Sequence, residues 1–236
     1  MNYIILAAGE GKRLHPFTKN YPKCLMNIGN GQRAIQRMTE LIKKFDPQAQ
    51  IHVVLGFKHK EVIPFIKGCK VTINPFYSVT NSVASLWFMK DLLADSATII
   101  NGDVIVSEKL MERIVSVKKL PTIFYDSSSK VDGDYNVQIH DNYIAVMGKE
   151  LNQYHGEYVG ITKLDKQSAV LLRNEICSLI DCGCFNEWYE NALVQMILNA
   201  DFKLNCFDVS EYEWHEIDTI NDLIFAKELI KKEGDQ

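Results

Sequence analysis

The feature that most constrains the fold is a short apolar segment near the start of the chain, followed at once by a long glycine-containing loop. Residues 3–8, Tyr-Ile-Ile-Leu-Ala-Ala, form a continuous apolar run, which is typical of a strand buried on both faces of a parallel sheet. Residues 9–32 show no helical or strand periodicity and contain four glycines and two prolines. Long loops of this kind inside compact domains are usually functional. We therefore expect a central strand whose carboxyl end opens into a functional loop.

The rest of the chain alternates between helical and strand-like patterns. Helices are expected at residues 33–45, 60–66, 82–93, 165–180, 187–200 and 219–232. Further strands are expected at residues 51–55, 70–73, 97–100, 121–125, 134–138, 142–146, 157–163, 203–207 and 214–217. Alternating strands and helices predict an α/β fold with three layers, in which helices cover both faces of a doubly wound, mostly parallel mixed sheet. The strands after residue 121 lack helices between the middle ones, which predicts a small antiparallel insert.

Length, charge and composition exclude several classes of protein. The 236 residues suffice for a single large domain, and 26 Lys and Arg against 30 Asp and Glu argue against a protein that neutralises a nucleic-acid backbone. No apolar stretch approaches the roughly 20 residues needed to span a membrane. Six scattered cysteines and no signal-peptide pattern predict a cytoplasmic protein with reduced thiols. Small-molecule chemistry is therefore favoured, and a homodimer is left open.

The loop after the first strand combines glycines with positive charge. Gly9 and Gly11 follow the strand directly, where the lack of a Cβ lets backbone N–H groups approach phosphate oxygens. Residues 9–23 also hold four cations against one anion, namely Lys12, Arg13, Lys19, Lys23 and Glu10. A dinucleotide-binding loop would need a third glycine where Leu14 stands, and a P-loop would need Gly-Lys-Ser/Thr. The pattern therefore indicates phosphate binding of another kind.

Two linked motifs in this loop resemble a known family. Residues 6–14 read Leu-Ala-Ala-Gly-Glu-Gly-Lys-Arg-Leu, and Pro22-Lys23 follow. They resemble the Ala-Ala-Gly-x-Gly-x-Arg and Pro-Lys signature of the nucleotidyltransferases that make NDP-sugars and CDP-alcohols. The resemblance implies a Rossmann-like nucleotidyltransferase fold and Mg²⁺-dependent transfer of a nucleotidyl group from an NTP to a phosphate acceptor, with release of pyrophosphate. Lys12 departs from the family pattern, which commonly has a small hydroxyl residue there.

Two aspartates are candidate metal ligands. Asp103 follows the expected strand 97–100, so it should project from the same sheet edge as the glycine loop. Asp218 lies where a short expected strand runs into the last helix. Carboxylate oxygens suit Mg²⁺, although a lone aspartate can equally occupy a turn or cap a helix. In the family that the loop resembles, both positions coordinate the metal.

The resemblance also implies roles for the other residues. Arg13 and Lys12 would hold the β- and γ-phosphates, and Lys23 would neutralise charge on the α-phosphate, so that catalysis is positioning plus charge stabilisation. The implied catalytic residues are Arg13, Lys23, Asp103 and Lys149. The implied nucleotide-binding residues are Leu6, Ala7, Ala8, Gly9, Glu10, Gly11, Lys12, Arg13, Lys23, Thr80, Asn81, Ser85 and Gly102.

Three later segments, at residues 74–86, 146–149 and 157–161, resemble the choline-phosphate cytidylyltransferase branch more than the sugar branch. CTP is therefore the expected nucleotide, and the expected acceptor is a phosphorylated alcohol, amine or sugar such as phosphocholine. The nucleotide would bind within about residues 1–120, and the acceptor within about 121–218. The implied acceptor-binding residues are Lys149, Glu157, Tyr158, Trp188 and Glu190.

Aromatic side chains could cage an ammonium group of the acceptor. The candidates are Trp87, Trp188, Tyr189 and Trp214, with Glu187 and Glu190. Trp188 also fits the buried stripe of a helix.

Cys182 and Cys184 lack a second pair at zinc spacing and are expected to be inert. Two other functions remain open, a sugar-1-phosphate nucleotidylyltransferase using UTP, dTTP or CTP, and a non-catalytic sensor of nucleotides or sugar phosphates.

Overall fold

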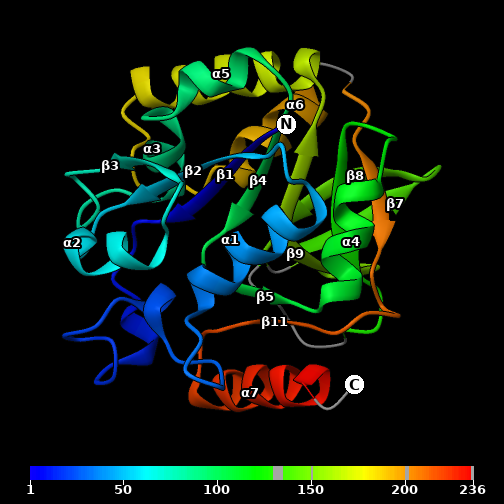
Figure 1. Ribbon diagram of the computed structural model, residues 1–236. Coiled ribbons are helices and arrows are strands. Elements are labelled where there is room, and N and C mark those ends of the chain that lie inside the picture. Colours follow the sequence, from blue (N-terminus) through cyan, green and yellow to red (C-terminus); the bar gives the residue numbers. More distant parts are fainter. Residues whose placement is uncertain (130–134, 150, 200–201, 235–236) are drawn as a thin grey trace.

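The computed structural model describes residues 1–129, 135–149, 151–199 and 202–234, and its main feature is one mixed sheet. Within these residues the strands follow the order β3-β2-β1-β4-β9-β6-β10-β8-β7 (Figure 1). Their bounds are β1 (Asn2–Ala7), β2 (Gln50–Leu55), β3 (Lys70–Ile73), β4 (Ala97–Asn101), β6 (Thr122–Asp126), β7 (Asn136–His140), β8 (Tyr143–Gly148), β9 (Gly156–Leu164) and β10 (Asn205–Asp208). A separate ribbon pairs β5 (Val104–Val106) with β11 (Trp214–Glu216).

The strand directions confirm the expected mixed sheet. β1 is parallel to β2 and to β4, and β2 is parallel to β3. β9 runs antiparallel to β4 and β6, and β8 runs antiparallel to β7 and β10. Only β8 and β9 of the described main sheet therefore oppose the other strands. As expected, β1 is an interior strand, and antiparallel pairing begins in the second half of the chain.

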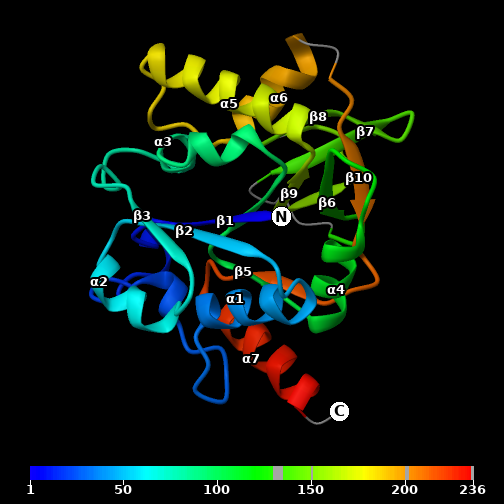
Figure 2. The ribbon, with the colours of Figure 1, turned by 45° about the horizontal axis from the view of Figure 1, so that its top comes forward.

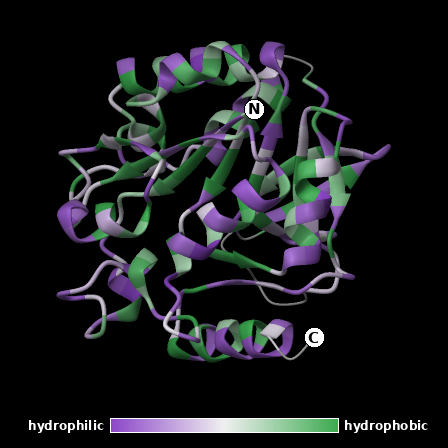
Figure 3. Cartoon of the chain, in the orientation of Figure 1, coloured by the Kyte–Doolittle hydropathy of each residue, from purple (hydrophilic) through white to green (hydrophobic). Residues whose placement is uncertain are grey.

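Helices cover both faces of this sheet (Figure 2). They are α1 (Ala34–Phe45), α2 (His59–Val62), α3 (Ser82–Trp87), α4 (Glu108–Ser116), α5 (Lys166–Asp181), α6 (Glu190–Asn199) and α7 (Ile220–Gly234). Single 3₁₀ turns lie at Lys12–Leu14, Lys23–Leu25, Ile63–Phe65 and Lys90–Ala94. Figure 3 shows the strands mostly in hydrophobic colours, whereas the helices alternate between hydrophobic and hydrophilic residues, as amphipathic covering helices do.

The first strand explains the two hydrophobic cores. Ile4 faces one core, which it shares with α3, α5 and α6, whereas Tyr3 and Ile5 face the other core, which contains α1 and α4. Successive strand residues point to opposite faces, so an uninterrupted apolar run is what a strand covered on both sides requires. The burial of these three side chains is complete or nearly so, as the sequence pattern predicts.

Several boundaries differ from the sequence expectations. β5 and α4 were not expected: the three residues of β5 are too few for a periodicity, whereas α4 buries Leu110, Met111 and Ile114 at helical spacing and was missed. The expected helix at 82–93 ends at Trp87 and continues as a 3₁₀ turn. The expected helix at 187–200 begins only at Glu190. The polar connection that includes residues 130–134 lies partly outside the described residues.

The end of α4 is held by a buried lysine of β9. Lys163, which is 3% exposed, donates hydrogen bonds of 3.0, 2.8 and 2.7 Å to the carbonyl oxygens of Ile114, Val115 and Val117. The last carbonyl groups of a helix have no partner within the helix. The lysine ammonium satisfies them and so fixes α4 against the sheet.

The β5–β11 ribbon connects the last part of the chain to the sheet edge. Glu216 pairs with Val104 across the ribbon, and the backbone N–H of Ile217 donates to the carbonyl oxygen of Asp103 at 3.0 Å. Below the ribbon, α7 packs its buried face against Leu14 of the glycine loop and Ile105 of β5 (Figure 1). The ribbon thus brings residues 216–218 to the carboxyl end of β4. Among the described residues, no helix is both long and apolar enough to cross a membrane.

Candidate active site

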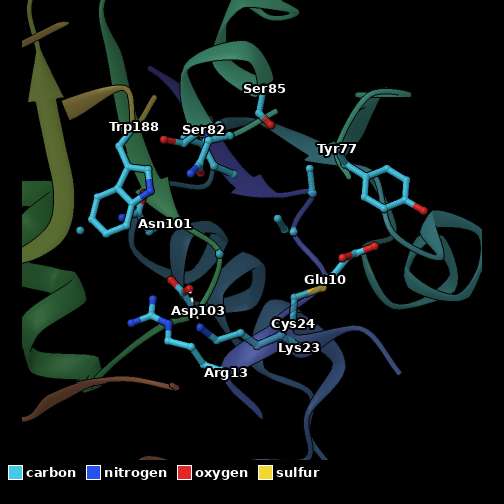
Figure 4. Close-up of a pocket in the computed structure, with 18 of the residues that line it drawn as sticks. Glu10, Arg13, Lys23, Cys24, Tyr77, Ser82, Ser85, Asn101, Asp103 and Trp188 are labelled. Atoms are coloured by element: carbon cyan, nitrogen blue, oxygen red, sulfur yellow. Dashed lines mark hydrogen bonds and ion pairs between the residues drawn. The ribbon is translucent and has the colours of Figure 1, made fainter. Parts of the chain in front are cut away.

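A cavity of about 450 Å³ lies where β1 and β4 end (Figure 4). It is lined by the glycine loop, by residues 77–85 and 101–103, by β9, by residues 186–190 and by the end of β11. All the residues that the sequence assigned to nucleotide binding, from Leu6 to Gly102, are among them. The topology therefore brings together residues that are far apart in the chain.

An ion cluster occupies one end of this cavity. The Nζ of Lys23 lies 2.8 Å from Asp103 Oδ2 and 2.5 Å from Asp218 Oδ1, although these aspartates are 80 and 195 positions away in sequence. Arg13 Nη1 lies 2.8 Å from the other oxygen of Asp218. Figure 4 shows Arg13, Lys23 and Asp103 converging from separate segments. The two predicted metal ligands therefore lie together, joined by the two predicted phosphate-binding cations.

The cluster holds Lys23 as a cation. Its side chain is 13% exposed, so burial by itself lowers the pKa of the ammonium. The negative charges and hydrogen bonds of Asp103 and Asp218 outweigh burial, and the pKa of Lys23 lies above its ordinary value. At neutral pH the ammonium stays protonated between the two carboxylates.

A third carboxylate completes the cluster. Carboxylate oxygens of Asp103, Glu216 and Asp218 lie within 4.8 Å of one another, the one such metal-compatible group found among the described residues. Sequence reasoning missed Glu216, which ends β11 two positions before Asp218. Oδ1 of Asp103 is buried and has no hydrogen-bond partner in the described part of the chain. Three oxygen donors and an unsatisfied carboxylate oxygen fit a hard divalent cation.

Two glycines shape the cavity wall. Gly11 has φ +66°, and a Cβ on it would lie 2.9 Å from the Cβ of Lys23, so a side chain here would be strained and would displace the lysine. A Cβ on Gly102 would lie 2.6 Å from the carbonyl oxygen of Leu6. The glycines therefore permit close approach of the loop to Lys23 and of β4 to β1.

The opposite wall is aromatic and acidic. Trp188 packs on Tyr135 with their ring centroids 5.2 Å apart, and Glu190, only 3% exposed, accepts a 3.3 Å hydrogen bond from Asn101 Nδ2. Burial and then the negative charge of Glu190 raise the pKa of Tyr135. Because α6 begins at Glu190, Trp188 precedes the helix and faces the cavity (Figure 4). Tyr135 was not singled out from the sequence.

Lys149 does not line the cavity itself but contacts Trp188, which does. Its Nζ lies 3.8 Å from the centroid of the Trp188 ring, within the range of a cation–π interaction. Tyr158 lines the cavity, and its hydroxyl lies 2.6 Å from that of Tyr189. Glu157 does not line the cavity and accepts a 2.8 Å hydrogen bond from Ser129 Oγ.

The aromatic cage expected from the sequence forms only in part. Trp188 and Glu190 line the cavity, but Tyr189 is fully buried. Trp87 lies outside the cavity under the ammonium of Lys90, 3.9 Å from the ring centroid. The other two candidates are also engaged elsewhere: Trp214 Nε1 donates to Asp126 Oδ2 at 2.8 Å, and Glu187 accepts a 2.6 Å hydrogen bond from Asn191.

The cysteines have no catalytic environment. Cys24 lines the cavity, and burial raises the pKa of its thiol to about 12, so it stays protonated. Cys182 and Cys184 are free thiols, and they belong to no metal-compatible cluster of the described residues.

Comparison with known proteins identifies the family. The nucleotidyl transferase family model matches residues 2–124, and the chain belongs to this family. It is 25% identical over 250 residues to the CTP:phosphoglutamine cytidylyltransferase of Campylobacter jejuni, covering 94% of this chain and 98% of that protein. It is 35% identical over 102 residues to the choline-phosphate cytidylyltransferase of Streptococcus pneumoniae, covering 42% of this chain and 43% of that protein.

Solved structures share the fold. The CTP:phosphocholine cytidylyltransferase LicC of Streptococcus pneumoniae superposes with a TM-score of 0.82 at 20% identity, covering 97% of this chain and 98% of that one. The inositol-1-phosphate CTP transferase of T. maritima superposes with a TM-score of 0.79 at 17% identity, covering 98% and 95%. These likenesses confirm the nucleotidyltransferase fold that the sequence motifs imply.

Proposed function

We propose that this protein transfers CMP from CTP to a small phosphorylated or phosphonate acceptor, such as phosphocholine, and releases pyrophosphate. The observation that carries the proposal is the cluster of Lys23, Asp103 and Asp218 beside the glycine loop. The chain belongs to the nucleotidyl transferase family. The relatives described above carry CTP in their names or are named cytidylyltransferases, which supports CTP as the donor.

The cationic end of the cavity suits the triphosphate. Arg13 and Lys12 offer positive charge to the β- and γ-phosphates, and the backbone of Gly9–Gly11 lies against the same space. Lys23, once drawn from its carboxylates toward the nucleotide, neutralises the charge that develops at the α-phosphate. An acceptor phosphate oxygen can then attack the α-phosphorus as pyrophosphate leaves from the opposite side. This reaction requires positioning and charge stabilisation but no covalent nucleophile.

The carboxylate cluster suits Mg²⁺ as the cofactor. Asp103, Asp218 and Glu216 supply oxygen ligands, and the buried, unpartnered Oδ1 of Asp103 supports a ligand there. When bound, Mg²⁺ would supply charge neutralisation for the reacting phosphates. The side chains of Lys23 and Arg13 hold the carboxylates in place in its absence.

The aromatic wall suits an acceptor that carries a positive group. Trp188 and Tyr135 offer ring faces, and the buried carboxylate of Glu190 supplies negative charge beside them. Lys149, whose ammonium contacts the ring of Trp188, would meet the acceptor phosphate. The relatives are named for choline phosphate and for phosphoglutamine as acceptors, which supports a small phosphorylated compound with a nitrogen-bearing group.

Pyrophosphate release tests the proposal. The protein is incubated with Mg²⁺, each of CTP, UTP, dTTP and ATP, and a panel containing phosphocholine, phosphoethanolamine, inositol 1-phosphate and glucose 1-phosphate. We expect release with CTP and an amine-bearing phosphate. Release with UTP or dTTP and the sugar phosphate would instead identify a sugar-1-phosphate nucleotidylyltransferase, and no release with any pair would indicate a sensor.

Two variants test the acceptor wall within the same assay. Glu190→Gln removes the negative charge but keeps the shape, so the KM for phosphocholine should rise while the KM for CTP stays within about twofold. Trp188→Leu should raise the KM for the same acceptor, because a cation loses about 0.5–2 kcal/mol without an aromatic face. An unchanged phosphocholine KM in both variants would remove this wall from the acceptor site.

A further inference from the structure

Asn74 lies directly behind the uncharged end of the cavity. It follows β3, is 0% exposed and does not line the cavity itself. Its Nδ2 donates to two hydroxyl groups, at 3.1 Å to Ser85 Oγ and at 3.1 Å to Thr80 Oγ1. Its Oδ1 accepts a 2.9 Å hydrogen bond from the backbone N–H of Phe76. The amide is thus fully hydrogen-bonded, and two of its three partners, Thr80 and Ser85, line the cavity.

The orientation of this amide is fixed by chemistry. A backbone N–H can only donate, so the group that faces Phe76 must be the oxygen of Asn74. The NH₂ group is then forced toward Ser85 and Thr80. The Thr80 hydroxyl in turn donates a hydrogen bond of 2.9 Å to the carbonyl oxygen of Phe76. Each polar atom of the Asn74 side chain therefore has one defined role.

This arrangement determines what Ser85 can do. The Ser85 oxygen already accepts from Asn74, and no described residue accepts the Ser85 hydroxyl proton. Ser85 lines the cavity at the end remote from Arg13 and Lys23 (Figure 4). A nucleotide whose phosphates lie at the cationic end has its base at this end. A ligand acceptor would satisfy the hydroxyl proton, whereas a ligand N–H would leave that proton unpaired and costly to bury.

We propose that Asn74 is a specificity-determining residue that fixes the Ser85 hydroxyl as a hydrogen-bond donor toward position 3 of the base and thereby favours cytosine over uracil or thymine. Position 3 distinguishes the bases, because N3 of cytosine is an acceptor whereas uracil and thymine carry an N–H there; O2 is an acceptor in all three. This inference rests on the proposed function only in placing a nucleotide in the cavity. Asn74 acts through Ser85, so it is a positioning residue.

Replacing the NH₂ donor of Asn74 by a hydrogen-bond acceptor tests the inference. Asn74→Asp keeps the shape, but its carboxylate accepts the Ser85 proton and leaves the Ser85 lone pairs facing the base. We expect the ratio of CTP to UTP, in kcat/KM and in affinity by calorimetry without acceptor, to fall by about tenfold to a hundredfold. Ser85→Ala should lower CTP binding and reduce the ratio without any gain for UTP.

Asn205→Asp is the matched control. Asn205 is a buried asparagine that donates to the carbonyl oxygen of Pro121, away from the cavity. Its replacement introduces the same buried acid, so it should lower stability and leave the CTP to UTP ratio unchanged. A purely structural role for Asn74 predicts equal losses for both nucleotides, as a general loss of folding would.

The outcomes separate this inference from the proposed function. If the wild-type protein releases no pyrophosphate, the proposed function fails, yet the calorimetric CTP to UTP ratio still decides the role of Asn74. An unchanged ratio in Asn74→Asp and Ser85→Ala overturns the inference even when turnover with CTP is normal. If Asn74→Asp does not fold, as judged by its thermal melting, Asn74→Ala is measured instead: it frees the Ser85 hydroxyl to rotate and should also lower the ratio, and an unchanged ratio overturns the inference.

Discussion

Replacing Lys23 should strengthen metal binding while it destroys turnover. In the free protein the Lys23 ammonium lies 2.8 and 2.5 Å from the carboxylate oxygens of Asp103 and Asp218, which are the proposed metal ligands. A divalent ion bound by them must therefore share its ligands with a cation or displace it. Lys23→Met keeps the length and much of the volume of the side chain but removes this competing charge.

The size of the effect follows from the charges. Two unit charges about 4 Å apart interact by ~1 kcal/mol in water and by ~4 kcal/mol at the effective dielectric constant of a protein surface. A dication doubles the repulsion, so even the aqueous limit gives about 2 kcal/mol, or about thirtyfold in Kd. The side chains of Asp103 and Asp218 are 24% and 16% exposed. The repulsion at this partly buried site is therefore larger than the value in water.

Titration with Mn²⁺, followed by electron paramagnetic resonance, measures this affinity without turnover. We expect the Kd for Mn²⁺ to fall by at least about thirtyfold in Lys23→Met, whereas pyrophosphate release falls by about 100–1000-fold because one charge-stabilising contact is lost. Lys19→Met is the control, since Lys19 belongs to the same basic loop, is exposed and has no ion pair with the aspartates among the described residues.

Two results would refute this reasoning. Equal Mn²⁺ affinity in the wild-type protein and in Lys23→Met would show that the ammonium does not compete for the carboxylates. Equal gains in Lys19→Met and Lys23→Met would assign the effect to net charge rather than to the ion cluster.

Three further substitutions test other parts of the structure. Asp103→Asn should lower kcat for pyrophosphate release by about 100–1000-fold, and near-normal turnover would exclude its role as a metal ligand. Glu216→Gln should weaken Mn²⁺ binding by about thirtyfold, because one negative charge beside the dication is lost; an unchanged Kd would remove it from the ligand set. Lys163→Met should lower the free energy of unfolding in urea by about 2–4 kcal/mol, since the carbonyl groups at the end of α4 lose a charged donor, with kcat unchanged. A loss below about 0.5 kcal/mol would contradict that role.

The glycine loop could be predicted from the sequence because its parts are contiguous. The buried strand, Gly9 and Gly11 and the nearby cations lie within one short stretch, and the rule that ligands bind at the carboxyl edge of parallel strands supplies its place in the fold. The same rule predicts that Asp103, which follows the strand β4, lies at that edge of the sheet. The loop residues Gly9, Gly11, Lys12, Arg13 and Lys23 line one cavity together with Asp103.

The residues that sequence reasoning missed depend on tertiary contacts. Glu216 joins the cluster only because β11 pairs with β5, and a three-residue strand carries too little periodicity to predict that pairing. Tyr135 reaches the cavity wall from the start of β7, across the sheet from the glycine loop. The prediction of an aromatic cage was wrong for Trp87 and Trp214, which are aromatic but lie outside the cavity. Composition supplies candidate side chains, but packing selects among them.

The pairing of β5 with β11 also has a consequence for the order in which the active protein is assembled. A nascent chain that has reached residue 124 already contains the glycine loop, Lys23 and Asp103, the part that the family model matches. Lys23 then has one carboxylate partner of the pair, because Asp218 is synthesised almost 100 residues later. The site is therefore completed only after the segment that contains β11 and Asp218 has left the ribosome. A chain cut before β11 would keep the glycine loop, Lys23 and Asp103 but lack Asp218, the second aspartate of the ion cluster.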